Sequence, residues 1–84
     1  MEELTSMRNI GKEIANKLKS VGICSAEELK RAGSKDAFLR LKSQYPKVCL
    51  VLLYSLQGAI EDTDYNRLSE ETKRELKAFS DWLK

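Results

Sequence analysis

Histidine is absent from this 84-residue sequence, and proline, cysteine and glycine are scarce, with one, two and four residues respectively. Without histidine, the chain lacks the usual general base at neutral pH and the usual partner of a nucleophilic serine or cysteine. So few turn-forming residues are also untypical of a β-rich fold, in which successive strands are joined by turns. We therefore expect neither a catalytic centre nor a β-sheet protein.

The two cysteines, Cys24 and Cys49, form no CxxC motif, and no histidine is present to complete a zinc site. Cys49 lies in an apolar run and is expected to be a small core residue, whereas Cys24 lies in a turn. We expect both thiols to be reduced, as in a cytoplasmic protein. The acidic start Met1-Glu2-Glu3 lacks the apolar core of a signal peptide, which also favours the cytoplasm.

The charge is nearly balanced overall but uneven along the chain. The net charge of +2 is not typical of a dedicated nucleic-acid-binding protein. Residues 1–47 carry ten cations and six anions, a net charge of +4, and the remaining residues carry five cations and seven anions, a net charge of −2. The basic excess lies in the half that carries the candidate site, although chance explains the distribution equally well.

Capping residues and glycine stops predict two helices in the first part of the chain. Apolar residues at helical spacing indicate a first helix over Gly11–Ser20, which Gly22 ends. Ser25 and Glu28 have the spacing of a capping box and predict the start of a second helix. Gly33 then ends that helix.

Three further helices are predicted in the rest of the chain. The first covers residues 34–45, with Ser34 as its expected cap. The second covers Val48–Ile60, where small residues at Gly58 and Ala59 would let another helix pass close by. Ser69 is the expected cap of the last helix.

The fold class that follows is all-α, with a compact bundle of about five helices in a single domain over residues 1–84. The segment Val48–Ile60 carries no charge, so it is expected to be a central helix that is buried on all sides. This segment is too short to cross a bilayer, which needs about 20 apolar residues. We therefore expect no membrane association.

The turn before the first helix, Asn9-Ile10-Gly11, is the candidate binding site. Asparagine tolerates left-handed backbone, glycine lets a ligand approach closely, and Ile10 would anchor the turn in the core. Unpaired amides at a helix start bind anions, so those near Gly11 and Lys12 would hold a DNA phosphate without reading the base sequence. The candidate phosphate-contacting residues are Arg8, Asn9, Gly11, Lys12 and Lys17.

An alternative interpretation is a protein–protein interaction or self-association module that binds no nucleic acid. Asn9 would then be an N-cap that uses up the free amides, and Glu13 in the first helical turn would repel a phosphate. The contact surface would be an apolar patch around Trp82, Phe79 or Tyr65.

The carboxylates offer no convincing chemistry. Most lie at predicted helix starts or on outward faces, where capping and solvation explain them. The acidic segment Glu61-Asp62-Thr63-Asp64 lacks the turn glycine and the distal glutamate of a calcium-binding loop. We therefore expect no catalytic, cofactor-binding or metal-binding residue and no small-molecule substrate.

Several motifs together resemble a known family. The sequence strings Asn9-Ile10-Gly11-Lys12, Val21-Gly22-Ile23, Ser25-Ala26-Glu27-Glu28-Leu29 and Leu53-Tyr54-Ser55-Leu56-Gln57-Gly58-Ala59 are similar to the C-terminal domain of the TfoX/Sxy competence regulators. The resemblance covers nearly the whole chain, and the string in the central helix is its most specific part. Tyr65 stands where the family often has tryptophan.

This resemblance implies a helix-hairpin-helix or SAM-like fold and a link to the regulation of DNA-uptake genes in bacteria. It supplies no catalytic residues, and the N-terminal domain of those regulators has no counterpart in this sequence. We therefore expect a cytoplasmic, non-enzymatic regulatory or adaptor domain. Its partner would be DNA, contacted through the backbone, or a regulatory protein, and the chain would be a monomer or a weak homodimer.

Overall fold

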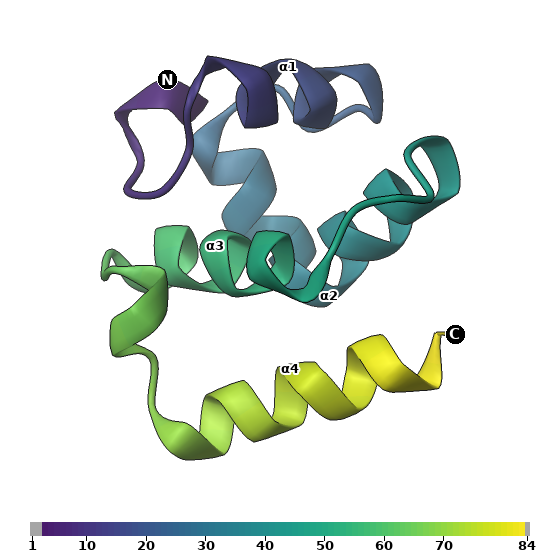
Figure 1. Cartoon of the computed structure of the whole chain (residues 1–84). Coiled ribbons are helices and arrows are strands. Elements are labelled where there is room, and N and C mark those ends of the chain that lie inside the picture. Colours follow the sequence, from purple (N-terminus) through teal and green to yellow (C-terminus); the bar gives the residue numbers. More distant parts are fainter. Residues whose placement is uncertain (1–2, 84) are drawn as a thin grey trace.

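The computed structural model describes residues 3–83, which form helices and contain no strand (Figure 1). The all-α class is therefore confirmed. The structure describes four α-helical elements in this part of the chain, and the two helices expected on either side of Gly33 are both present within one of them, joined across a kink at Gly33. The elements are η1 (Leu4–Ser6), α1 (Lys12–Ser20), α2 (Ala26–Gln44), α3 (Leu50–Glu61), η2 (Tyr65–Arg67) and α4 (Glu70–Trp82), where η denotes a 3₁₀-helix.

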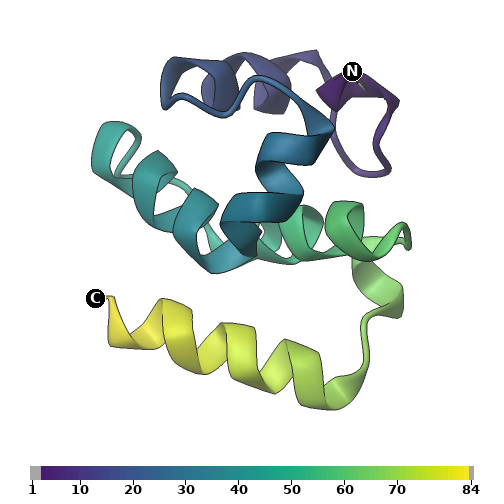
Figure 2. The same ribbon diagram turned by 180° about the vertical axis from the view of Figure 1, so that it is seen from behind.

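The kink in α2 lies at Gly33, which has φ of +85° and ψ of 159°. This backbone region is open almost exclusively to glycine. Figure 2 shows the two halves of α2 running in different directions on either side of it. The hydroxyl of the next residue, Ser34, donates a hydrogen bond of 2.5 Å to Gln57 Oε1 of α3. Ser34 thus connects two helices, a role that its expected position at a helix start did not suggest.

Both other serine caps are present as predicted. Ser25 Oγ accepts a hydrogen bond from the Glu28 amide at 3.2 Å, and Ser69 Oγ accepts one from the Thr72 amide at 3.1 Å. The Glu28 carboxylate in turn accepts a hydrogen bond from the Cys24 amide, one residue before the cap, at 3.2 Å. The capping box therefore reaches one residue further back than its usual form.

Helix α3 occupies the middle of the bundle, with α2 packed on one side and α4 on the other (Figure 1). Leu53 and Leu56 of α3 are fully buried and belong to the same core as Phe38 and Leu41 of α2. Helix α4 lies at the edge of the bundle and buries Leu76 fully against this core. The predicted central position of the apolar helix is confirmed.

Two expectations about that helix are wrong in detail. Cys49 is exposed rather than part of the core, because it is the extended N-cap residue that precedes α3. Val51 is 51% exposed, so the helix is not covered on all sides. The first turn of α3 directly follows the connection from α2 (Figure 1). None of the helices within residues 3–83 is long and apolar enough to cross a membrane.

Candidate functional site

The N-cap residue of α1 is Gly11, whose backbone is extended with φ of −90° and ψ of −178°. No side chain caps this helix, in contrast to α2 and α4. Gly11 and Lys12 are both exposed, and so is Glu13 in the first turn. The structure thus presents uncapped helix amides beside one cation and one anion. Free amides at a helix start are able to bind an anion. The carboxylate of Glu13 weakens such binding by repelling the anion.

Asn9 has left-handed backbone, with φ of +69°, as its residue type suggested. Its side chain does not cap α1. Instead, Asn9 Nδ2 donates hydrogen bonds to the carbonyl oxygens of Thr63 at 3.0 Å and Ser55 at 3.5 Å. Ile10 is only 5% exposed and anchors the turn in the core, as predicted. The turn is therefore fixed by one polar and one apolar side chain, and the amide of Asn9 is engaged within the protein.

Gly58 explains how the turn can lie so close to α3. A Cβ atom on Gly58 would lie 2.5 Å from Asn9 Nδ2, 2.7 Å from Thr63 O and 3.2 Å from Tyr65 N. The sequence predicted that a second helix would pass this point. The structure places there the Asn9 side chain, the Thr63 carbonyl oxygen and Tyr65, the first residue of the 3₁₀-helix η2. The small residue is therefore needed both for the polar contact with Asn9 and for the close approach of η2.

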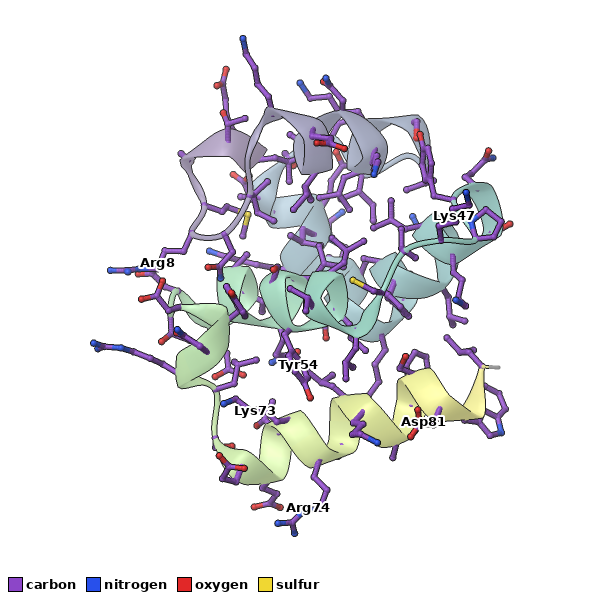
Figure 3. All side chains as sticks on the ribbon, viewed as in Figure 1. Arg8, Lys47, Tyr54, Lys73, Arg74 and Asp81 are labelled. Carbon is purple, nitrogen blue, oxygen red and sulfur yellow. The ribbon has the colours of Figure 1, made fainter. Side chains whose placement is uncertain are left out.

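The two flanking cations both have partners. Arg8 Nε lies 3.4 Å from Asp62 Oδ1, and Figure 3 shows Arg8 pointing outward beside the connection after α3. Lys17 Nζ lies 3.6 Å from Glu13 Oε1 and 5.3 Å from the centre of the Tyr45 ring. Exposed ion pairs of this kind add little stability, but they reduce the positive field at the site.

The five residues predicted to contact phosphate therefore do not all lie at one place in the structure. Gly11 and Lys12 lie together at the exposed helix start, and Arg8 lies before the turn with its carboxylate partner. Asn9 supports the turn from within, and Lys17 lies further along α1 against Tyr45. Elsewhere, the described residues contain no group of three or more cysteine, aspartate or glutamate side chains placed to hold a metal ion.

A second surface feature was not found from the sequence. A groove of about 430 Å³ lies between the C-terminal half of α1 and the connection from α2 to α3. We call it the Tyr45 groove. In the sequence, the residues of this groove are a Tyr-Pro pair and lysines scattered around it. They follow no helical periodicity, so the pattern of the sequence does not predict the groove. The residues that line it are Lys17, Gln44, Tyr45, Pro46, Lys47 and Val48.

These features define a small all-α domain with two exposed surface sites, an uncapped helix start and an apolar groove edged by lysines. Residues 1–80 match the family model of the TfoX C-terminal domain, and the chain belongs to this family. The family expected from the sequence motifs is thus confirmed.

Two crystal structures of proteins from Listeria monocytogenes are similar to the chain. One, an uncharacterized protein in a triclinic form, is 41% identical with a TM-score of 0.94, and the match covers 95% of this chain and 91% of that one. The other, a protein of unknown function in a tetragonal form, is 40% identical with a TM-score of 0.95, covering 98% of this chain and 100% of that one. A search of curated proteins gave no match.

Proposed function

We propose that residues 1–84 form a single non-enzymatic regulatory or adaptor domain that acts in the bacterial cytoplasm in the control of DNA-uptake genes. Membership of the TfoX C-terminal domain family supports this role. The absence of histidine from the sequence also supports a binding function rather than catalysis.

Within this role, the N-terminus of α1 contacts the DNA backbone. The observation that supports this contact most strongly is that α1 begins at an exposed glycine and has no side-chain cap. The amides of the first turn then have no intrahelical acceptors, and Lys12 supplies a cation beside them. Ile10 and the hydrogen bond from Asn9 to Thr63 hold the turn in place, so little ordering is required on binding.

Charge sets the strength of this contact. Glu13 and Asp62 oppose it, and the net charge of the chain is only +2. Neutralising about three phosphates would give a salt slope of roughly −2.7, which is shallow for a DNA-binding protein. Because the contact is with phosphates and not base edges, it is independent of DNA sequence. The binding is therefore weak and unspecific.

Fluorescence anisotropy with a short labelled DNA duplex at low salt tests this proposal. We expect binding at tens of micromolar protein and its loss in a Gly11→Ala, Lys12→Glu double variant. Gly11 has open space around it and unstrained backbone, so the double variant should fold. The matched control is Gly11→Ala with Lys30→Glu, which changes the net charge equally at an exposed position on α2. No binding, or equal binding by the two double variants, would contradict the proposal.

A second candidate function, protein–protein interaction through α4, is favoured by Trp82, which is 76% exposed. Trp82 stacks on Phe79 with 6.2 Å between ring centres. Tyr65 lies in η2, at the opposite end of α4 (Figure 1), so these three residues do not form one patch. Light scattering at high protein concentration tests self-association, which a mass equal to one chain would exclude.

A further inference from the structure

The Tyr45 groove combines an apolar surface with positive charge. Tyr45, Pro46 and Val48 contribute the apolar surface, and Lys17 and Lys47 lie at its edges. The polar residue Gln44 completes the lining, which contains no carboxylate. A ligand that fits such a groove has an apolar group beside negative charge.

The groove is built by contacts that fix its walls. Tyr45 Oη and Ser20 Oγ share a hydrogen bond of 2.9 Å, which joins the end of α1 to the end of α2. The amide of Val48 donates to the Tyr45 carbonyl oxygen at 3.0 Å and closes the turn around Pro46. Lys42 Nζ donates to the Pro46 carbonyl oxygen at 3.4 Å. These bonds form the groove before any ligand arrives, and such preorganisation favours binding.

Positive charge predominates around this end of the molecule. Lys17 and Lys47 line the groove, and Lys42 reaches the carbonyl oxygen of Pro46 beside them. Lys17 is paired with Glu13 at 3.6 Å, an exposed carboxylate outside the lining of the groove. The acidic connection after α3 is remote, since Figure 3 places Lys47 at the opposite end of the molecule from Arg8, the partner of Asp62. The groove is therefore complementary to an anionic ligand.

The orientation of Tyr45 decides between two kinds of anion. Nucleic-acid bases bind by stacking on an open aromatic face. Lys17 Nζ already lies 5.3 Å from the centre of the Tyr45 ring, and the hydroxyl of this ring is held by Ser20. The remaining apolar surface, from Pro46 and Val48, suits an inserted side chain better than a stacked base.

We propose that the Tyr45 groove binds an acidic segment of a partner protein. An apolar side chain of that segment packs against Pro46 and Val48 beside Tyr45. Its carboxylates pair with Lys47 and with Lys17, whose present ion pair with the exposed Glu13 is weak and exchanges for the ligand. The groove does not include Gly11 or Lys12, so this interaction is independent of the DNA contact proposed for the start of α1. A domain with both contacts would link DNA to an acidic protein, as an adaptor does.

The test is a titration of the ¹⁵N-labelled chain with the capped synthetic peptide Glu-Asp-Phe-Leu-Asp-Glu, followed by amide chemical shifts. We expect saturable shifts confined to the amides of Gln44, Tyr45, Lys47 and Val48 and of the C-terminal half of α1, at peptide concentrations up to about 5 mM. Replacing Phe and Leu of the peptide with Ser should abolish these shifts. A peptide of the same length with Lys in place of each acidic residue should also give none.

Variants at exposed lysines make the test specific. Lys47→Glu should weaken peptide binding by about threefold or more at low salt, because it turns an exposed attractive pair into a repulsive one. Lys30→Glu changes the net charge equally at an exposed position on α2 that does not line the groove, and it should leave binding unchanged. Both residues are exposed, so we expect both variants to fold.

Five outcomes would overturn the proposal. They are the absence of shifts at the highest peptide concentration, shifts centred elsewhere, equal shifts with the Ser or the Lys peptide, equal effects of the two variants, and tighter binding of a single-stranded oligonucleotide than of the peptide at the same amides. Concentration-dependent shifts of these amides without peptide would instead identify a second copy of the chain as the occupant. The DNA proposal is tested separately, because DNA binding depends on Lys12 and is measured by anisotropy with a duplex, whereas peptide binding depends on Lys47.

Discussion

The side-chain amide of Asn9 donates a hydrogen bond to the carbonyl oxygen of Thr63, with 3.0 Å between the two atoms. These residues are 54 positions apart, and the bond joins the turn before α1 to the connection after α3. Asn9 has φ of +69°, a conformation that short polar residues adopt more easily than others. One side chain therefore both permits the turn and attaches it to the central helix.

Replacing Asn9 should separate these two contributions. Asn9→Ala loses the hydrogen bonds and places an ordinary residue in left-handed backbone, so we expect a cost of about 2–3 kcal/mol in unfolding free energy. Asn9→Gly loses only the hydrogen bonds and should cost about 1 kcal/mol. Urea denaturation measures both. Wild-type stability in the alanine variant, or a glycine variant less stable than the alanine variant, would contradict this interpretation.

Gly58→Ala should destabilise the protein by about 1–3 kcal/mol, although alanine is the better helix former by about 1 kcal/mol. The new Cβ would lie 2.7 Å from the Thr63 carbonyl oxygen, which belongs to the backbone and cannot easily move. Gly11→Ala is the matched control, because no atom lies within 4 Å of the added Cβ and φ is −90°. Thermal unfolding should show a clear loss for the first variant and little change for the second. Similar melting temperatures would contradict the close approach.

The kink in α2 gives a third prediction. Gly33 has φ of +85° with ψ of 159°, and this region excludes side chains even where space is open. Gly33→Ala should therefore cost about 1–3 kcal/mol. Gly33→Asn should not restore stability, since asparagine tolerates left-handed helical backbone but not this extended region. Urea denaturation of the two variants is the measurement, and wild-type stability of Gly33→Asn would show that the kink is not as described.

The sequence was sufficient where a feature depends on neighbours along the chain. Ser25 and Ser69 are recognisable as caps from the three residues that follow them, and Gly33 as a break from its place between two helical patterns. The uncharged run that became α3 predicted the centre of the bundle. Each of these signals is local, so the fold class and most helix boundaries followed from them.

The sequence was insufficient where a feature depends on tertiary position. Nothing in the neighbourhood of Asn9 indicates that its amide reaches Thr63, and that contact also explains Gly58. The apolar character of Cys49 and Val51 suggested burial, but both lie at the start of α3 with their side chains exposed. The Tyr45 groove was missed for the same reason, because Lys17 joins Tyr45 and Lys47 only in the folded chain.

The salt dependence of DNA binding gives a fourth prediction. With about three phosphates neutralised, affinity for a duplex should fall roughly 40-fold between about 50 mM and 200 mM salt. Two duplexes of equal length and unrelated sequence should bind equally, since no base edge is read. Anisotropy titrations across this range measure both effects. A salt-independent affinity, or a strong preference between the two duplexes, would be incompatible with a backbone contact at the start of α1.

The central claim is that the uncapped N-terminus of α1 holds a DNA phosphate. Amide chemical shifts of the ¹⁵N-labelled chain, recorded during titration with a short duplex at low salt, test it most directly. We predict that the largest shifts occur at the amides of Lys12, Glu13 and Ile14 and that they disappear in Lys12→Glu but persist in Lys30→Glu. Shifts confined to other surfaces, or no shifts at duplex concentrations that saturate the anisotropy signal, would contradict it.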